Sequence, residues 1–161
     1  MSGSLEWGSV SDLVSMLASV GTLFVGCFAF ATWKSQVILQ DRYAKADDLL
    51  RSYRELMQAG HDMHWHRFGS DEVAPRIGSS ELWAWQDALF KYRGTYSLAQ
   101  LLFSRELGQD SLLEPDRIQK DVIALGKFIR ERDSISFIQE ISAMQNNGIA
   151  ALQRFKLGRC L

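Results

Sequence analysis

Residues 13–33 read LVSMLASVGTLFVGCFAFATW, an apolar run of 21 residues with no charged residue, proline, asparagine or glutamine. At the helical rise of about 1.5 Å per residue, a helix over this run is roughly 30 Å long, which is the hydrocarbon thickness of a bilayer. Helices buried in soluble proteins are usually shorter and carry polar residues on one face. The run therefore predicts a transmembrane helix.

The charges on the two sides of this run predict its orientation. Residues 1–12 contain Glu6 and Asp12 but neither Lys nor Arg. The basic residues that follow the run are Lys34, Arg42, Lys45, Arg51 and Arg54. Because basic residues near a span stay on the cytoplasmic side, we expect a short extracytoplasmic N-terminus and a cytoplasmic C-terminal body. Trp33 would then lie at headgroup depth, where interfacial aromatic residues gather.

A cleaved signal peptide is the alternative interpretation of the same run. Ala29-Phe30-Ala31 resembles the small-residue site that signal peptidases cut, and cleavage there would leave residues 32–161 as a soluble exported domain. However, no basic residue precedes the run, and its apolar core exceeds the usual length of about 7–15 residues. An uncleaved anchor is therefore the favoured interpretation.

Small residues recur on one face of the expected span. Ala18, Thr22 and Gly26 are spaced four residues apart, which places them on one stripe of a helix. Small residues on such a stripe allow a second membrane helix to approach closely, so they predict a homo-oligomer or pairing with another membrane protein. The alternative is that small residues are simply common in membrane spans.

The composition favours helices and argues against a nucleic-acid-binding protein. The chain has 161 residues, a net charge of −1 and only two prolines. Its basic residues are interspersed with acidic ones, whereas a nucleic-acid-binding protein would carry a clustered basic face. Cys27 lies inside the apolar run and Cys160 is next to last, so no disulfide framework is expected and the body fits a reducing compartment.

The rest of the chain predicts a helical body. The expected helices cover residues 34–59, 80–107, 112–132 and 134–157. Gly60 is expected to end the first of them, and residues 60–79 form a long loop rich in turn-forming residues. Within the last helix, Asn146-Asn147-Gly148 marks a weak point. With short connections elsewhere, we expect an all-α fold, one transmembrane helix followed by a roughly four-helix antiparallel cytoplasmic bundle.

Apolar residues at alternating spacings of four and three define the stripes that these helices are expected to bury. Residues 34–59 carry Leu39, Tyr43, Ala46, Leu50, Tyr53 and Met57 on such a stripe. Residues 80–107 carry Trp85, Leu89, Tyr92, Tyr96, Ala99 and Phe103. Trp83 and Phe90 lie on a different face of the second helix, so that helix is apolar on two sides and suits the bundle centre or a partner interface.

The histidines are the strongest candidates for chemistry. His61, His64 and His66 lie within six residues of one another, next to Asp62. Neutral imidazoles and carboxylates are good zinc ligands, so the cluster predicts a possible metal site. Their spacing does not fit one helical face, because His61 and His64 match at i, i+3 and His66 does not. The alternative is a polar transition from helix to loop.

Neither a GxSxG motif, nor a glycine-rich phosphate loop, nor a paired Cys/His nucleophile pattern occurs in the sequence. We therefore expect a non-enzymatic protein without a cofactor, nucleic-acid partner or identified small-molecule substrate. The predicted function is that of a membrane-anchored interaction or scaffold protein that associates with itself. One alternative is a membrane-perturbing effector of the phage-defence, superinfection-exclusion or toxin type. Another is a metal or ligand sensor that uses His61, His64 and His66.

The general architecture is similar to that of small bacterial membrane proteins with a cytosolic helical body. The segment Thr32-Trp33-Lys34-Ser35-Gln36, at the end of the expected span, contributes to this resemblance. We expect the protein to lie in the bacterial inner membrane, with its N-terminus outside and its C-terminal body in the cytoplasm.

Overall fold

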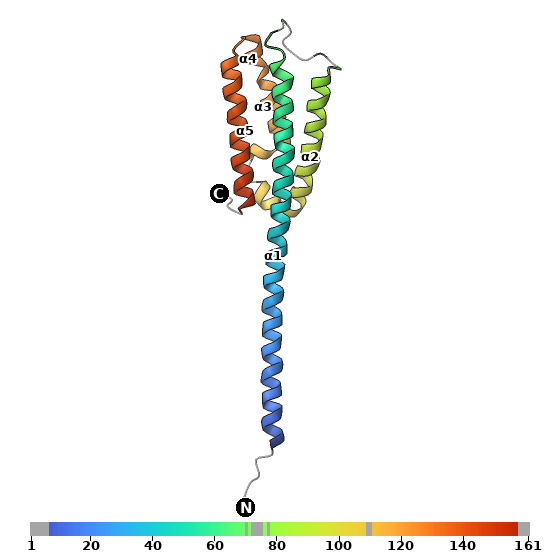
Figure 1. The fold of residues 1–161 in the computed structure, drawn as a ribbon, viewed down its shortest axis with the longest axis vertical. Helices are drawn as coiled ribbons and strands as arrows, with labels where there is room; N and C mark the ends of the chain where they lie inside the picture. Colours follow the sequence, from blue (N-terminus) through green and yellow to red (C-terminus); the bar gives the residue numbers. More distant parts are fainter. Residues whose placement is uncertain (1–6, 70, 72–75, 77, 109–110, 158–161) are drawn as a thin grey trace, which may run out of the picture. The chain divides into compact units, whose positions relative to one another are not determined.

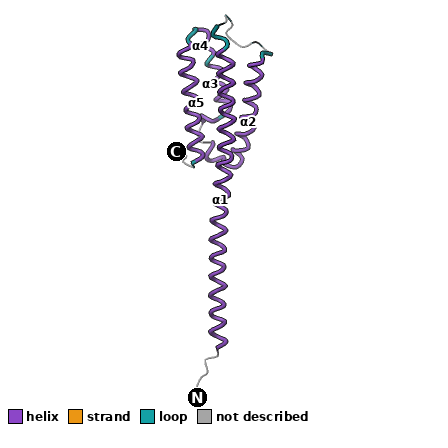
Figure 2. Tube along the Cα trace, viewed as in Figure 1, coloured by secondary structure: helices purple, strands orange, loops and turns teal. Residues whose placement is uncertain are grey.

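The computed structural model describes residues 7–69, 71, 76, 78–108 and 111–157. The regular structure of these residues is entirely helical (Figure 1), and the coloured parts of Figure 2 contain helices and loops but no strand. The expectation of an all-α fold is thereby confirmed. By its internal contacts the chain divides into two units, Met1–Asp41 and Arg42–Leu161.

The described part of the first unit is helical and belongs to α1 (Trp7–Trp65). All residues from 11 to 40 are exposed, including the whole apolar run 13–33. The hydroxyl groups of Ser19, Thr22, Thr32 and Ser35 each donate a hydrogen bond to the carbonyl four residues earlier, at 2.8–3.0 Å. The helix thus satisfies these hydroxyls without solvent.

The C-terminal end of α1 differs from the expectation, because Gly60 does not end the helix. The helix continues to Trp65, so residues 60–65 are helical and the connection to the next helix is shorter than expected. Gly60 is buried where α1 approaches two other helices. A Cβ atom at Gly60 would lie 3.2 Å from Cγ1 of Val122 and 3.7 Å from Cδ1 of Trp85. The glycine therefore permits a close approach instead of capping a helix.

The other helices of the second unit are α2, α3, α4 and α5, with one short 3-10 turn, η1. Their bounds are α2 (Ser80–Leu107), η1 (Ser111–Leu113), α3 (Pro115–Ala124), α4 (Gly126–Arg130) and α5 (Ser134–Lys156). Figure 1 shows α2, α3 and α5 running beside the part of α1 that belongs to this unit. Ser79 caps α2 by accepting a hydrogen bond from the backbone N–H of Leu82, and Pro115 opens α3. Asp133 caps α5 by accepting a hydrogen bond from the N–H of Ser136.

The core of the second unit confirms most of the expected stripes. All six residues of the α2 stripe are buried. On α1, Ala46, Tyr53 and Met57 are buried as expected, but Leu39 is exposed and belongs to the first unit. Leu49, which the expected stripe omits, is completely buried. The buried face of α1 is therefore rotated slightly from the one that the 4-3 spacing selects.

The expected helix over residues 112–132 is wrong as a single element, because it is broken at Leu125. The carbonyl of Val122 accepts hydrogen bonds from the N–H of Leu125 at 3.2 Å and from Nε2 of His64 at 2.9 Å. At the end of α4, Arg132 adopts a positive φ of 54°, and the N–H of Asp133 donates to the carbonyl of Phe128. This is the Schellman arrangement that ends many helices.

The expected weak point at Gly148 is not a break either, because α5 continues through it. Gly148 lies against the ring of Tyr53, and a Cβ atom there would overlap the Cζ and Oη atoms of that side chain. The hydroxyl of Tyr53 donates a hydrogen bond of 2.8 Å to the carbonyl of Met144, one turn earlier on α5. Gly148 thus makes room for a tyrosine that connects α1 to α5.

Candidate functional site

His64, one of the three candidate ligands, is buried in the core of the second unit. It is 3% exposed, and its ring meets that of Phe137 edge-on, with 5.8 Å between the centroids. Because a carbonyl only accepts hydrogen bonds, Nε2 must carry the proton in the 2.9 Å contact with the oxygen of Val122. Burial lowers the pKa of His64, although the hydrogen bond to Val122 opposes this shift. His64 is therefore a neutral hydrogen-bond donor between α1 and α3.

His61 and His66 do not join His64 in a metal site. The ring of His61 stacks on that of Trp65, with 5.6 Å between centroids and an angle of 14° between the planes. Its Nδ1 lies 3.6 Å from a carboxylate oxygen of Asp62. His66 lies beyond the end of α1 and is exposed. Among the residues that the structure describes, no group of three or more His, Cys, Asp or Glu side chains is placed to hold a metal ion.

Aromatic contacts explain what the histidine region does in the fold. Phe137 of α5 packs against His61 and His64, and Phe68 meets Phe137 edge-on with 5.0 Å between centroids. Phe68 in turn contacts Trp65, with 5.6 Å between centroids. The cluster joins the end of α1 to the start of α5. The alternative of a polar transition from helix to loop therefore does not describe the whole region, because His61 and His64 pack against the ring of Phe137.

The candidate helix-packing residues Ala18, Thr22 and Gly26 are all exposed in the first unit. A Cβ atom at Gly26 would meet no other atom within 4 Å, and the hydroxyl of Thr22 bonds to the carbonyl of Ala18 at 2.9 Å. The stripe is therefore open to a second helix. Its use in self-association stays a prediction.

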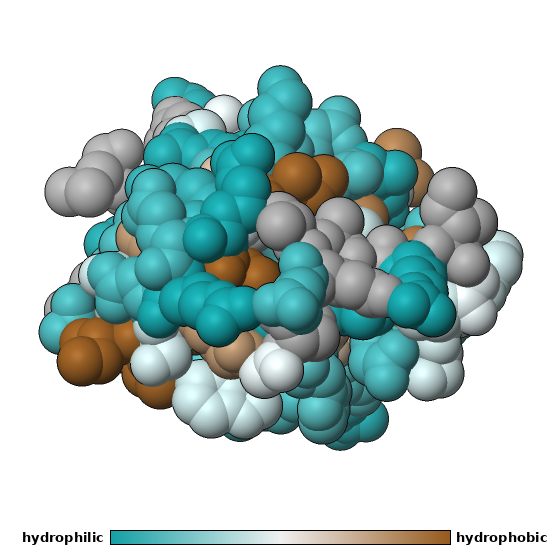
Figure 3. All heavy atoms as spheres, turned by 90° about the horizontal axis from the view of Figure 1, so that it is seen from above, coloured by the Kyte–Doolittle hydropathy of each residue, from teal (hydrophilic) through white to brown (hydrophobic). Residues whose placement is uncertain are grey.

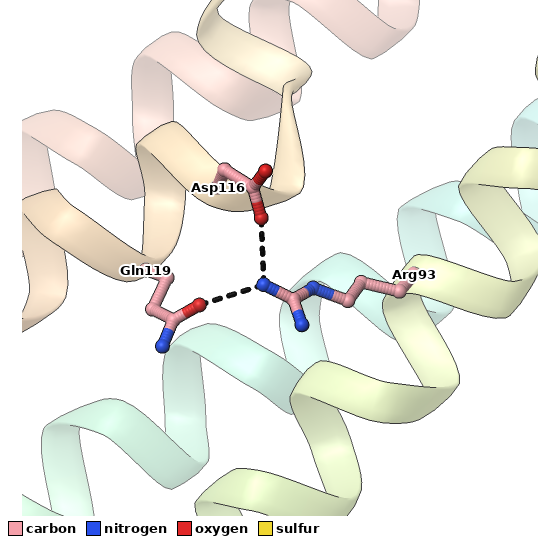
Figure 4. A network of polar contacts seen from close by, with 3 residues as sticks. All are labelled: Arg93, Asp116 and Gln119. Atoms are coloured by element: carbon pink, nitrogen blue, oxygen red, sulfur yellow. Dashed lines mark hydrogen bonds and ion pairs between the residues drawn. The ribbon is translucent and has the colours of Figure 1, made fainter.

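A polar network joins α2 to α3 at the surface of the second unit. Figure 4 shows the guanidinium of Arg93 pointing toward two acceptors on α3. Its Nη2 lies 2.6 Å from a carboxylate oxygen of Asp116 and 2.7 Å from the amide oxygen of Gln119. The network borders a polar hollow of about 550 Å³, which Tyr96 and Glu114 also line. Because Arg93 and Asp116 are both exposed and paired with each other, this network is a structural link of modest strength.

The outer face of α2 carries large apolar side chains that this chain leaves uncovered. Trp83 is 61% exposed, Phe90 78% and Leu101 81%. They lie on the face opposite the buried stripe, so the prediction that this helix is apolar on two sides is confirmed. By contrast, the end of the second unit that Figure 3 presents is covered mainly by hydrophilic side chains. Apolar exposure on this scale is typical of an interaction surface.

Sequence reasoning missed the contact between His64 and Val122, although part of the signal was present. If the 4-3 spacing of Tyr53 and Met57 is continued, it reaches Gly60 and then His64. The pattern therefore places the imidazole on the buried face of α1. The partner carbonyl of Val122 is 58 residues away, and no local pattern identifies it.

The described chain thus combines an exposed apolar helix with a packed all-helical unit. Comparison of the chain with protein-family models, with curated proteins and with solved structures finds no match. The functional conclusion therefore rests on the residues and contacts of this chain.

Proposed function

We propose that the protein is a single-pass membrane protein that holds a helical interaction domain at the inner face of the bacterial inner membrane. Residues 13–33 cross the bilayer, residues 1–12 lie outside, and the second unit lies in the cytoplasm. The observation that carries this proposal is that residues 11–40 are all exposed while most of them are apolar. An apolar helix of this length has no packing partner within the described chain, and a bilayer is the solvent that it fits.

The internal hydrogen bonds of this helix support the same environment. The hydroxyl groups of Thr22 and Thr32 donate to the carbonyl four residues earlier, so these two donors need no water. The basic residues after Trp33, set against none in residues 1–12, support a cytoplasmic second unit.

The contacts along α1 support an antiparallel bundle for the cytoplasmic body. Toward α5, Asp47 contacts Lys156, Tyr53 contacts Met144, and His64 contacts Phe137. Toward α2, Arg42 lies over the ring of Phe103, Tyr53 contacts Tyr92, and Gly60 approaches Trp85. In both series the partner's residue number falls as the α1 number rises, which is the signature of antiparallel neighbours.

The function that this arrangement suits best is that of a non-enzymatic scaffold that associates with itself. Two surfaces support this role. One is the open stripe of Ala18, Thr22 and Gly26 in the span, and the other is the apolar outer face of α2. Polar side chains of the second unit link neighbouring helices, as Arg93 does with Asp116, or pair within one helix, as Lys91 does with Asp87.

Cysteine labelling in intact cells tests the proposed topology. In a Cys27→Ser background, Ser4→Cys should react with a membrane-impermeant maleimide added from outside. Cys160 should react only after the cells are permeabilised. Labelling of Cys160 in intact cells would contradict the proposed topology. Cleavage that removes the N-terminal segment with the new cysteine would also contradict it.

A further inference from the structure

We propose that the outer face of α2 docks onto the same face of a second copy of this chain, with the two α2 helices parallel. This inference rests on the proposed membrane anchor, because the anchor brings copies of the chain together in one bilayer. It adds a cytoplasmic interface to the self-association that the small residues of the span predict.

The outer face of α2 has the spacing of a helix-pairing seam. Positions 83, 87, 90, 94, 97 and 101 follow one another at intervals of four and three residues, and all six are exposed. This register runs two residues ahead of the buried stripe that begins at Trp85, so the two stripes lie on opposite sides of the helix. A seam of this kind lets two parallel helices pack at about 20° to each other.

Gly94 lies in the middle of this seam and has no packing role among the residues that the structure describes. A Cβ atom there would meet no other atom within 4 Å. Glycine inside a helix costs about 1 kcal/mol relative to alanine. Tyr53 makes Gly148 necessary and Val122 makes a small residue at Gly60 useful, but no contact of the described chain accounts for Gly94. A helix of a second copy that approaches closely at this point would account for it.

The apolar area on this face suits a dimer. The exposed side chains that contribute to it are Trp83, Phe90, Leu98 and Leu101. Given about 150–250 Å² for a large aromatic side chain, these four offer on the order of 500 Å². A standard interface buries roughly 800 Å² on each partner, of which only the central part is apolar. The face therefore supplies most of what one side of a specific dimer requires.

The charges beside the seam are compatible with parallel pairing. In a parallel pair, Gln86 would face Lys91 of the second copy, and Gln100 would face Arg105, so these flanking pairs join no like charges. Arg93, which also borders the seam, is already paired with Asp116. The one charged residue within the seam is Asp87, whose carboxylate lies 3.3 Å from Nζ of Lys91 on the same helix. That ion pair reduces the repulsion between the two copies of Asp87.

A second copy fits this face better than a lipid surface does. The apolar residues run along one side of α2 from Trp83 to Leu101, over five turns of the helix, and the carboxylate of Asp87 lies between them. Lipid acyl chains would leave that carboxylate desolvated, whereas a second helix allows it to stay at the edge of the contact. Two copies held in one bilayer also meet at a high effective concentration, so a modest interface is sufficient.

Cysteine cross-linking of the full-length chain in native membranes tests this proposal. In a Cys27→Ser/Cys160→Ser background, Phe90→Cys and Leu101→Cys should each cross-link to themselves through a short bismaleimide. Lys120→Cys, on the exposed side of α3, is the matched control and should cross-link at least tenfold less. Adding Trp83→Asp to Phe90→Cys should remove most of the cross-linked dimer, and Asp87→Leu should increase it.

The outcomes separate this inference from the proposed function. If the protein is membrane-bound but Phe90→Cys cross-links no more than Lys120→Cys, the α2 interface is refuted while the anchor stands. A cross-linked product whose mass is not twice that of the chain identifies a foreign partner and also refutes the interface. If the protein is recovered from the soluble fraction, the anchor itself is refuted.

Discussion

Helix α1 passes through both units, and its two parts meet different surroundings. From residue 11 to residue 40 all side chains are exposed, and apolar residues such as Phe24 and Phe28 face outward. From Ala46 to His64 the same helix buries one stripe against α2, α3 and α5. The first part has the composition of a helix in lipid, where the surroundings solvate apolar side chains. The second part is amphipathic because water covers its other face.

Because of this difference, the glycines of the two units have different surroundings. Gly26 faces open space, whereas Gly60 and Gly148 lie where another side chain approaches. A larger side chain at Gly26 should therefore leave the packing of its own chain unchanged, whereas one at Gly148 should disrupt the second unit.

Gly148→Val should destabilise the second unit by about 3 kcal/mol or more, because the new side chain overlaps the ring of Tyr53. Urea unfolding of the full-length chain in detergent micelles, followed by tryptophan fluorescence, measures this loss. The matched control is Gly26→Val, which should leave unfolding of the second unit unchanged. An equal urea midpoint for Gly148→Val and the unaltered protein would contradict the packing described for Tyr53.

Acid should weaken the second unit through His64. Its pKa is lowered in the fold, so between that value and the ordinary value of 6.5 the unfolded chain binds more protons than the folded one. The contribution of the neutral imidazole is therefore complete above about pH 6.5 and is lost as the pH falls toward the folded pKa. When the melting temperature is measured between pH 8 and pH 5, it should decrease as the pH falls below about 6.5.

Two variants isolate this effect of pH. Replacing the exposed His66 by Gln should leave the pH dependence unchanged. His64→Gln keeps a side-chain donor for the carbonyl of Val122 but cannot titrate, so it should flatten the profile. A profile that is the same with and without His64 would show that this imidazole is not the titrating group.

Ser79→Ala should have a smaller effect, a loss of about 1 kcal/mol, because it removes the hydroxyl that caps α2. Ser80→Ala is the matched control, because Ser80 is the first residue of the helix and not its cap. The difference between the two variants in urea midpoint measures the cap. If Ser80→Ala is the more damaging variant, the start of α2 has been placed one residue too early.

The smallest expected effect concerns leakage of the bilayer. Liposomes that contain the full-length chain should retain a trapped dye as well as empty liposomes do, because a scaffold does not perturb the membrane. The contrary result is that the unaltered protein releases the dye and that Gly26→Ile abolishes the release while the second unit remains folded. This result would favour the membrane-perturbing effector over the scaffold. Retention of dye by both proteins supports the scaffold.

The sequence predicts the helices better than it predicts their ends. The burial of the stripe from Trp85 to Phe103 follows from periodicity, because only one face of α2 meets the core. Gly60 was wrongly interpreted as a helix end, since glycine serves equally to end a helix and to permit close approach. Only the position of Val122, which is distant in sequence, distinguishes the two roles.

The candidate site is harder to predict than the helices, because the partners of its residues are distant. Three histidines close together indicate metal binding, yet His64 donates to the carbonyl of Val122 and His61 stacks on Trp65. The same carbonyl also accepts from the N–H of Leu125, at the break between α3 and α4. The exposed apolar face of α2 was predictable, because Trp83 and Phe90 lie out of phase with the buried stripe.

The most direct test of the membrane anchor is the intact mass of the protein recovered from membranes washed at alkaline pH, which removes peripheral proteins. We expect the chain to stay in the washed membranes and to have the mass of all 161 residues, allowing for loss of the first methionine. A soluble product that begins at Thr32 would show that residues 1–31 are a removable signal, and it would contradict the anchor.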